Sequence, residues 1–133
     1  MTLSNEDRKA IISYRIERSH TALTEAEYVA KGNFWNLAAN RLYYAAFYIC
    51  EALLLDNQIS TSSHAGVSRM INLHFIRNGI LTKEDGVLLG RLFRMRQTGD
   101  YDDLSDWTEE EILPMFSDVK DLISKIQNLI KFV

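Results

Sequence analysis

Apolar residues recur at intervals of three and four positions along nearly the whole chain, which is the spacing of a helix with one buried face. We find no strand-like alternation, no internal repeat and no low-complexity segment. One proline and six glycines in 133 residues leave room for few turns. The pattern predicts an all-α fold, an antiparallel bundle of four to five helices that forms a single domain over residues 1–133.

Capping residues and glycines divide this pattern into five expected helices. A capping box of Ser4 and Asp7 begins the first helix, Gly32 ends it, and Asn33 is expected to cap the second. Similar signals place the expected helices at about 4–31, 34–55, 63–78, 82–98 and 108 to near the end of the chain, with Gly79 ending the third, Thr82 and Asp85 opening the fourth, Gly99 closing it, and Thr108 and Glu111 opening the fifth. Pro114 falls inside the last helix, so we expect a kink or a later start there.

The expected second helix is apolar on almost every side. On the helical wheel, Arg41, Tyr44 and Tyr48 gather opposite the face of Leu42 and Ile49. A helix of this kind lies in the centre of its bundle, or it carries a second contact surface for a dimer or a ligand. Both interpretations remain open at this stage.

Arg96 occupies an unusual place on the expected fourth helix. It follows Leu92 by four residues and Phe93 by three, so it projects into the apolar face that those residues define. A guanidinium keeps its proton there and needs a polar or acidic partner, or it must reach solvent. In one interpretation Arg96 holds the following loop through Asp100 while Tyr101 packs over the bundle end. In the other, Arg96 and a polar partner face a cleft and bind a phosphate.

The net charge of −3 argues against a generally basic surface for nucleic acid, although a local basic patch is compatible with it. From 64 to 96 the sequence has six Lys and Arg against two acids, and from 100 to 121 it has nine acids against Lys120. This change from basic to acidic residues along the chain is common on solvent-exposed faces. It is also compatible with self-association, or with a polyanion that binds along the third and fourth helices.

The remaining chemistry is sparse. His64 stands at the start of the third helix, where the free backbone N–H groups favour a neutral imidazole that serves either as a cap or as a base. Cys50 is the single cysteine, in an apolar run, and no Cys/His set has metal-ligand spacing, so no metal and no cofactor are expected. No signal peptide and no membrane span is recognisable, and we expect a cytoplasmic protein without a membrane contact.

Four ordered segments carry a resemblance to a known family: "NRLYYAAFYICEALL" (40–54), "SHAGV" (63–67), "HFIRNGIL" (74–81) and "LFRMRQTGDYDD" (92–103). Together they resemble the HEPN superfamily, the higher eukaryotes and prokaryotes nucleotide-binding domains. The match is to a small prokaryotic branch whose motif reads Arg-x-x-x-Asp-Tyr. The resemblance implies a dimerising helical bundle with a role around RNA or nucleotides. It also implies a two-gene toxin–antitoxin or defence module with a minimal nucleotidyltransferase as partner.

The resemblance also implies a pair of catalytic residues. In many members of the family, an arginine and a histidine four to six residues after it cleave RNA without a metal. Arg96 matches the arginine, but the last histidine of this chain is His74, and Asp100 and Tyr101 stand where the histidine is expected. An aspartate beside an arginine has a lowered pKa and is a poor acid near pH 7. His64 can replace the missing imidazole if the fold brings it to Arg96. Tyr101 matches, with different spacing, a tyrosine that receives nucleotidyl groups in some relatives.

The sequence therefore favours a HEPN-type component of a toxin–antitoxin or defence module that binds RNA or a nucleotide, with metal-independent ribonuclease activity as a hypothesis. The expected catalytic residues are Arg96, Asp100 and His64, and the expected binding residues are Arg41, Tyr44 and Tyr101. The alternative is a non-catalytic helical interaction module that forms a homodimer or binds a partner.

Overall fold

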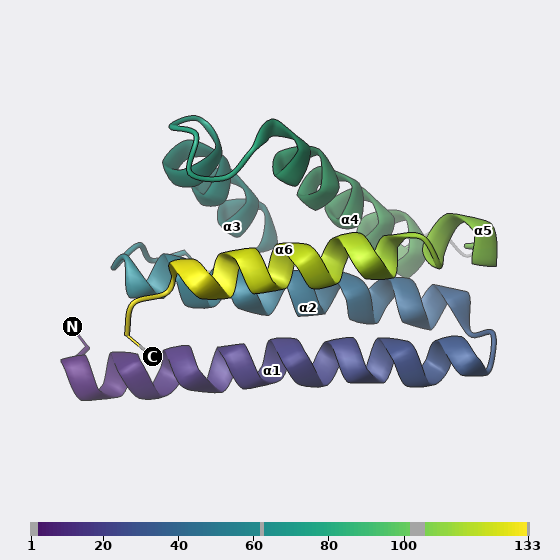
Figure 1. Cartoon of the computed structure of the whole chain (residues 1–133), viewed down its shortest axis with the longest axis horizontal. Coiled ribbons are helices and arrows are strands. Elements are labelled where there is room, and N and C mark those ends of the chain that lie inside the picture. The colour runs from purple at the N-terminus through teal and green to yellow at the C-terminus, as the bar shows by residue number, and fades with distance from the viewer. Residues whose placement is uncertain (1–2, 62, 102–105, 133) are drawn as a thin grey trace.

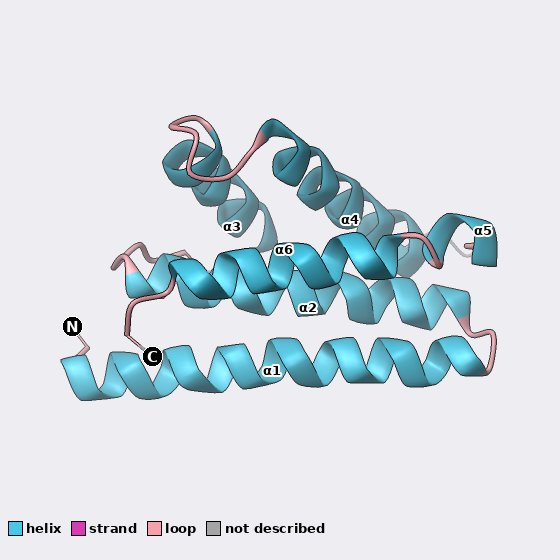
Figure 2. Ribbon diagram, in the orientation of Figure 1, coloured by secondary structure: helices cyan, strands magenta, loops and turns pink. Residues whose placement is uncertain are grey.

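A computed structural model describes residues 3–61, 63–101 and 106–132, and for 97–101 it describes the helical backbone alone. The helices are α1 (Asn5–Lys31), α2 (Trp35–Asp56), α3 (His64–Ile71), α4 (Lys83–Tyr101), α5 (Glu109–Ile112) and α6 (Met115–Leu129), with a π-helical turn at Asn72–Ile76. Over these ranges no strand is present (Figure 2). The prediction of an all-α fold is confirmed.

Helices α1 and α2 form a long antiparallel hairpin, and α6 runs along it, as Figure 1 shows. Helices α3 and α4 form a second hairpin against α2, and the two ends of the chain lie at the same end of the bundle. Helix α2 is central, since 11 of its 22 residues are buried. The interpretation of α2 as the core helix is therefore correct, and its ends and flanks remain available for other contacts.

Small residues allow α1 and α2 to approach closely. Ala22 and Ala26 of α1 and Ala38 and Ala45 of α2 are all at most 1% exposed. At the same seam, Ser19 Oγ donates a hydrogen bond of 2.6 Å to the Ala45 carbonyl oxygen. The bond satisfies the fully buried hydroxyl of Ser19, so the polar group carries little desolvation penalty.

Most of the predicted helix ends are confirmed. Ser4 Oγ accepts from the Asp7 N–H at 3.0 Å, and Thr108 with Glu111 forms a complete capping box. Thr82 and Asp85 likewise exchange hydrogen bonds at the start of α4. Gly79, with φ of 83°, ends the third segment, and Pro114 separates α5 from α6.

Three local predictions were wrong. Asn33 does not cap α2: it adopts a left-handed conformation with φ of 65°, which asparagine tolerates, and Phe34 takes the N-cap position. Gly99 does not end α4, which continues to Tyr101, because a helical glycine costs only about 1 kcal/mol and does not impose a stop. The helix predicted over 63–78 is α-helical only to Ile71, and a π-helical turn follows to Ile76, after which the Arg77 N–H donates to the Asn72 carbonyl.

None of the helices within the described ranges combines the length and the apolar character that crossing a membrane requires.

Two leucines of α2 provide a matched test of this core. Leu42 is fully buried, whereas Leu37 is 48% exposed. We expect Leu42→Ala to lower the free energy of unfolding by about 2–5 kcal/mol, because it leaves a cavity at the centre of the bundle. Leu37→Ala should change it by less than about 1 kcal/mol. Urea denaturation measures both, and similar losses for the two variants would contradict the central position of α2.

Candidate functional site

An aromatic cluster lies where α2 faces the start of α3. We define it as Tyr43, Tyr44, Phe47, Tyr48 and His64. Tyr43 and Phe47 are one helical turn apart and stack with ring centroids 5.7 Å apart, and Tyr44 and Tyr48 repeat this spacing at 5.7 Å. Because positions four apart share a helix face, one stretch of α2 supplies four adjoining rings.

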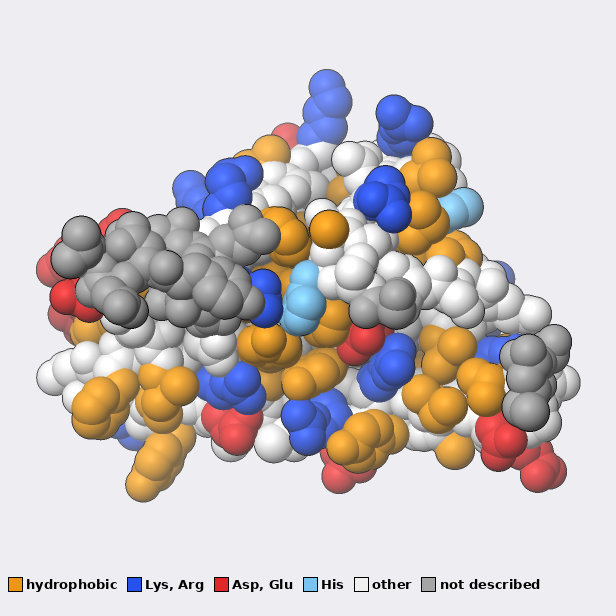
Figure 3. All heavy atoms as spheres, turned by 180° about the vertical axis from the view of Figure 1, so that it is seen from behind, with side chains coloured by type: hydrophobic (Ala, Val, Ile, Leu, Met, Phe, Trp, Pro, Cys, Tyr) orange, Lys and Arg blue, Asp and Glu red, His pale blue; other side chains and the backbone are white. Residues whose placement is uncertain are grey.

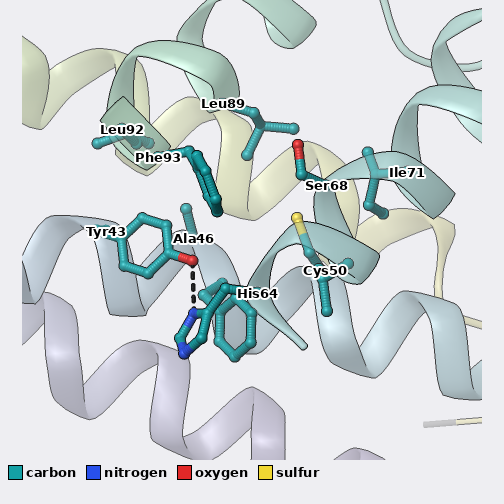
Figure 4. Close-up of a pocket in the computed structure, with 11 residues that line it drawn as sticks. Tyr43, Ala46, Cys50, His64, Ser68, Ile71, Leu89, Leu92 and Phe93 are labelled. Carbon is teal, nitrogen blue, oxygen red and sulfur yellow. Dashed lines mark hydrogen bonds between the residues drawn. The ribbon is translucent and has the colours of Figure 1, made fainter. Parts of the chain in front are cut away.

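The start of α3 carries His64 into this cluster. Ser63 caps α3, with its Oγ accepting from the Gly66 N–H at 2.9 Å. Gly66 is buried, and a Cβ there would collide with Thr61 Oγ1, so the turn depends on glycine. The His64 ring then stacks on Phe47 with centroids 4.4 Å apart, and its Nδ1 lies 2.8 Å from the Tyr43 hydroxyl (Figure 4).

Tyr43 is the buried centre of the cluster, with 5% of its surface exposed. Burial raises the pKa of its hydroxyl above the ordinary value, although the positive charge of Arg96 acts in the opposite direction. The hydroxyl therefore keeps its proton at neutral pH. A hydroxyl both donates and accepts, so Tyr43 can hold His64 in either protonation state of the imidazole.

Arg96 reaches the same tyrosines from α4. Its Nε donates to the Tyr44 hydroxyl at 3.4 Å, and its Cζ lies 5.7 Å from the centre of the Tyr43 ring. The imidazole of His64 is also 5.8 Å from each of these two rings, measured between centroids. The fold thus brings Arg96 and His64, which are far apart in sequence, to the same pair of tyrosines.

Arg41 borders the cluster on its other side. Its Cζ lies 5.0 Å from the centre of the Tyr44 ring, and its guanidinium donates to Asn40 Oδ1 at 2.8 Å and 3.0 Å. Its Nη1 also forms an ion pair of 3.2 Å with Glu25. Arg41 and Tyr44 therefore form one continuous contact surface, but Glu25 partly neutralises the charge of Arg41.

Two of the sequence-predicted site residues cannot be placed as side chains. Asp100 and Tyr101 form the last turn of the α4 backbone, and their side chains lie outside the described part of the structure. An ion pair between Arg96 and Asp100 therefore stays a prediction. Asp102 and Asp103, two further acids that follow Arg96 closely enough in the sequence to be its partners, fall outside the described residues.

A small apolar pocket adjoins the cluster, as Figure 4 shows, between Tyr43, Phe47, His64 and the facing residues of α3 and α4. Its volume of about 30 Å³ is the space of a water molecule and is far too small for a nucleotide. A larger ligand at this cluster would therefore contact its open side and not the pocket. Within the described residues no three His, Cys, Asp or Glu side chains converge as metal ligands do.

Sequence reasoning did not single out Tyr43 and Phe47. Both side chains are mainly apolar and are therefore expected in the core. On the helical wheel, only Tyr44 and Tyr48 lie with Arg41 on the face of α2 that is opposite Leu42 and Ile49. One signal was available: a tyrosine on a buried face needs a partner for its hydroxyl. That requirement points from Tyr43 to a polar group on another helix, which here is His64.

Comparison with known proteins relates the sequence of this chain to a family. The model of the HEPN domain matches residues 12–133. The chain is 34% identical over 125 residues to a "UPF0332 protein" of Thermotoga maritima, an alignment that covers 94% of this chain and 95% of the relative. It is 28% identical over 129 residues to a protein of Methanocaldococcus jannaschii named "Putative toxin MJ0605", covering 97% of this chain and 96% of the relative. A second protein of that organism, "Putative toxin MJ0142", is 33% identical over 96 residues, which are 72% of this chain and 65% of the relative.

The contact between Tyr43 and His64 can be measured by a double-mutant cycle. Tyr43→Phe keeps the ring and removes the hydroxyl, and His64→Ala removes the imidazole. We expect a coupling of about 1 kcal/mol between them in the free energy of unfolding, the size of a part-buried hydrogen bond.

Tyr48→Phe is the matched control for this cycle, because the Tyr48 hydroxyl accepts from Arg18 and not from His64. Its effect should add to that of His64→Ala within about 0.3–0.5 kcal/mol. Additivity for Tyr43→Phe as well would show that the hydrogen bond does not form in solution.

Proposed function

The chain belongs to the HEPN domain family, and from that premise we propose that it is a toxin-like HEPN protein that binds RNA at the aromatic cluster and cleaves it. The observation that supports this proposal is the meeting of Arg96 and His64 at Tyr43 and Tyr44. The toxin designation in the names of the two archaeal relatives agrees with it.

The chemistry needs a cation for the phosphate and an imidazole for proton transfer. In the proposed reaction the ribose 2′-oxygen loses its proton to His64 and attacks the neighbouring phosphorus. The bond from phosphorus to the 5′-oxygen breaks, that oxygen takes up a proton from water, and His64 releases to solvent the proton that it received. The products are a 2′,3′-cyclic phosphate and a 5′-hydroxyl end. Arg96 stabilises the negative charge that builds up on the phosphate oxygens.

Tyr43 is a positioning residue in this proposal. Its hydroxyl holds His64 Nδ1, which fixes the orientation of the ring. Phe47 supports the same ring by stacking. The proposed role of Asp100 is to orient Arg96, and that of Tyr101 is to contact the bound nucleotide. A homodimer and a minimal nucleotidyltransferase partner, which the family resemblance implies, belong to the same proposal.

A non-catalytic interaction module is the second candidate, and one observation favours it. Arg96 is half-buried and packs on two tyrosines, which is also how an arginine stabilises a junction between helices. In that case Arg96→Ala lowers the melting temperature markedly, and replacing Tyr44 and Tyr48 by alanine disrupts a dimer.

Cleavage of RNA in the presence of EDTA tests the leading proposal. We expect the wild-type protein to cleave single-stranded RNA and to leave 2′,3′-cyclic phosphate ends. Arg96→Ala and His64→Ala should each reduce the rate by about 100-fold or more, as the loss of a charge-stabilising donor or of an acid–base group does.

Arg91→Ala is the control for this assay, because Arg91 is an exposed arginine on the same helix, α4, and should leave the rate unchanged. Melting curves of all variants separate a lost site from a lost fold. Equal rates of cleavage by wild type and Arg96→Ala would show that the active site does not lie at the aromatic cluster. Absence of cleavage in every sample, with a marked fall in the melting temperature of Arg96→Ala, would support the interaction module instead.

A further inference from the structure

A row of arginines and tyrosines continues from the aromatic cluster across α2 and onto α1. We call it the arginine–tyrosine strip and define it as Tyr14, Arg18, Tyr48, Tyr44 and Arg41. Arg18 Cζ lies 6.0 Å from the centre of the Tyr14 ring and 5.0 Å from that of Tyr48. Tyr48 and Tyr44 follow with centroids 5.7 Å apart, and Arg41 lies 5.0 Å from Tyr44. Five planar groups thus form an unbroken series over two helices.

Arg18 is the distinctive member of the strip. It is exposed, and its Nη2 donates to the Tyr48 hydroxyl at 2.9 Å. Its neighbour Arg15 pairs with Glu51, and Arg41 pairs with Glu25, but Arg18 makes no ion pair with any residue that the structure describes. Its full positive charge is therefore held in place by two neutral tyrosines.

Tyr14 completes the exposed end of the strip. With 57% of its surface exposed, its ring is available to solvent. An exposed ring beside an uncompensated guanidinium offers a stacking surface together with a charge for a phosphate. On the face seen in Figure 3, basic side chains lie among hydrophobic ones, a class that includes tyrosine in that figure, and acidic side chains lie beside several of them.

We propose that the arginine–tyrosine strip is a binding track for single-stranded RNA, which leads the strand from α1 over α2 to Arg96 and His64. The inference rests on the proposed function and adds the substrate class and the path. Tyr44 joins the two regions, because it belongs to the strip and also accepts the hydrogen bond of Arg96. A strand on the strip would therefore present its next phosphate to Arg96.

The chemistry of the strip selects single strands over duplexes. Bases of a duplex are stacked on each other and paired, so their faces cannot reach protein rings. Bases of a single strand can stack on tyrosine or on a guanidinium plane, whatever their identity. The strip should accordingly bind unpaired RNA with little sequence preference and with a marked dependence on salt.

Fluorescence anisotropy with an oligouridylate of about 16 nucleotides, the upper end of single-strand site sizes, tests the track. The probe carries 2′-O-methyl groups, which prevent cleavage during the measurement, and a second sample is annealed to oligoadenylate as the duplex. We expect the double substitution Tyr14→Ser with Arg18→Gln to weaken single-strand binding by about 10-fold or more and to flatten the salt dependence by about 0.7 in log–log slope. The affinity for the duplex should not change. Arg18→Lys keeps the positive charge but lacks the planar guanidinium. Its affinity for the single strand should lie between those of wild type and the double variant.

The control is Tyr28→Ser with Lys31→Gln, an exposed tyrosine and cation on the same helix, outside the strip, that should bind as wild type does. If Arg96→Ala loses binding while the Tyr14/Arg18 variant retains it, the track is wrong and the proposed site stands. If wild type binds no RNA, the proposed function fails and the track with it. If the Tyr14/Arg18 variant changes the oligomeric mass in light scattering, the strip is a protein interface and the track is overturned.

Discussion

The constraint on which this structure depends is the central position of one helix, α2, half of whose residues are buried. Helix α2 packs against α1, α3, α4 and α6, and it does so with alanines on one seam and large aliphatic side chains elsewhere. A core of this kind has few polar groups, so each one must find a partner within the bundle. Ser19 meets this requirement at the seam with α1 by donating to a backbone carbonyl of α2.

Tyr43 meets the same requirement in a way that creates a site. Its ring belongs to the core, but its hydroxyl points to the edge of α3 and meets the imidazole of His64. The adjoining Tyr44 lies half-buried and receives Arg96 from α4. The demand for hydrogen-bond partners on a buried aromatic helix thus assembles two polar groups from two other helices. The cluster is a consequence of how α2 packs.

The fold was largely predictable because helical periodicity and caps are local properties of the sequence. Ser4, Thr82 and Thr108 begin helices where their side chains can accept backbone N–H groups, and Pro114 interrupts one where its ring forbids continuation. Gly99 misled the prediction, because glycine permits a helix to end without requiring it. The candidate site was harder to predict from the sequence than the fold was. Arg96 stood out on its wheel, but the convergence of Arg96 and His64 on the same two tyrosines depends on how the α3–α4 hairpin packs on α2. Residue spacing does not encode that tertiary arrangement.

The arginines of the open face differ in how their charge is held, and this difference bears on what the face can bind. Arg15 and Arg41 lie against carboxylates, which fix them in place and also cancel much of their field. Arg18 is fixed by ring faces and a hydroxyl, which orient the guanidinium and leave its charge intact. Tyrosine is therefore the more useful neighbour for an arginine that must stay ordered before an anion arrives. A phosphate that meets such a group gains a charge-assisted hydrogen bond without first displacing a carboxylate, and the same tyrosine offers the adjacent base a surface to stack on.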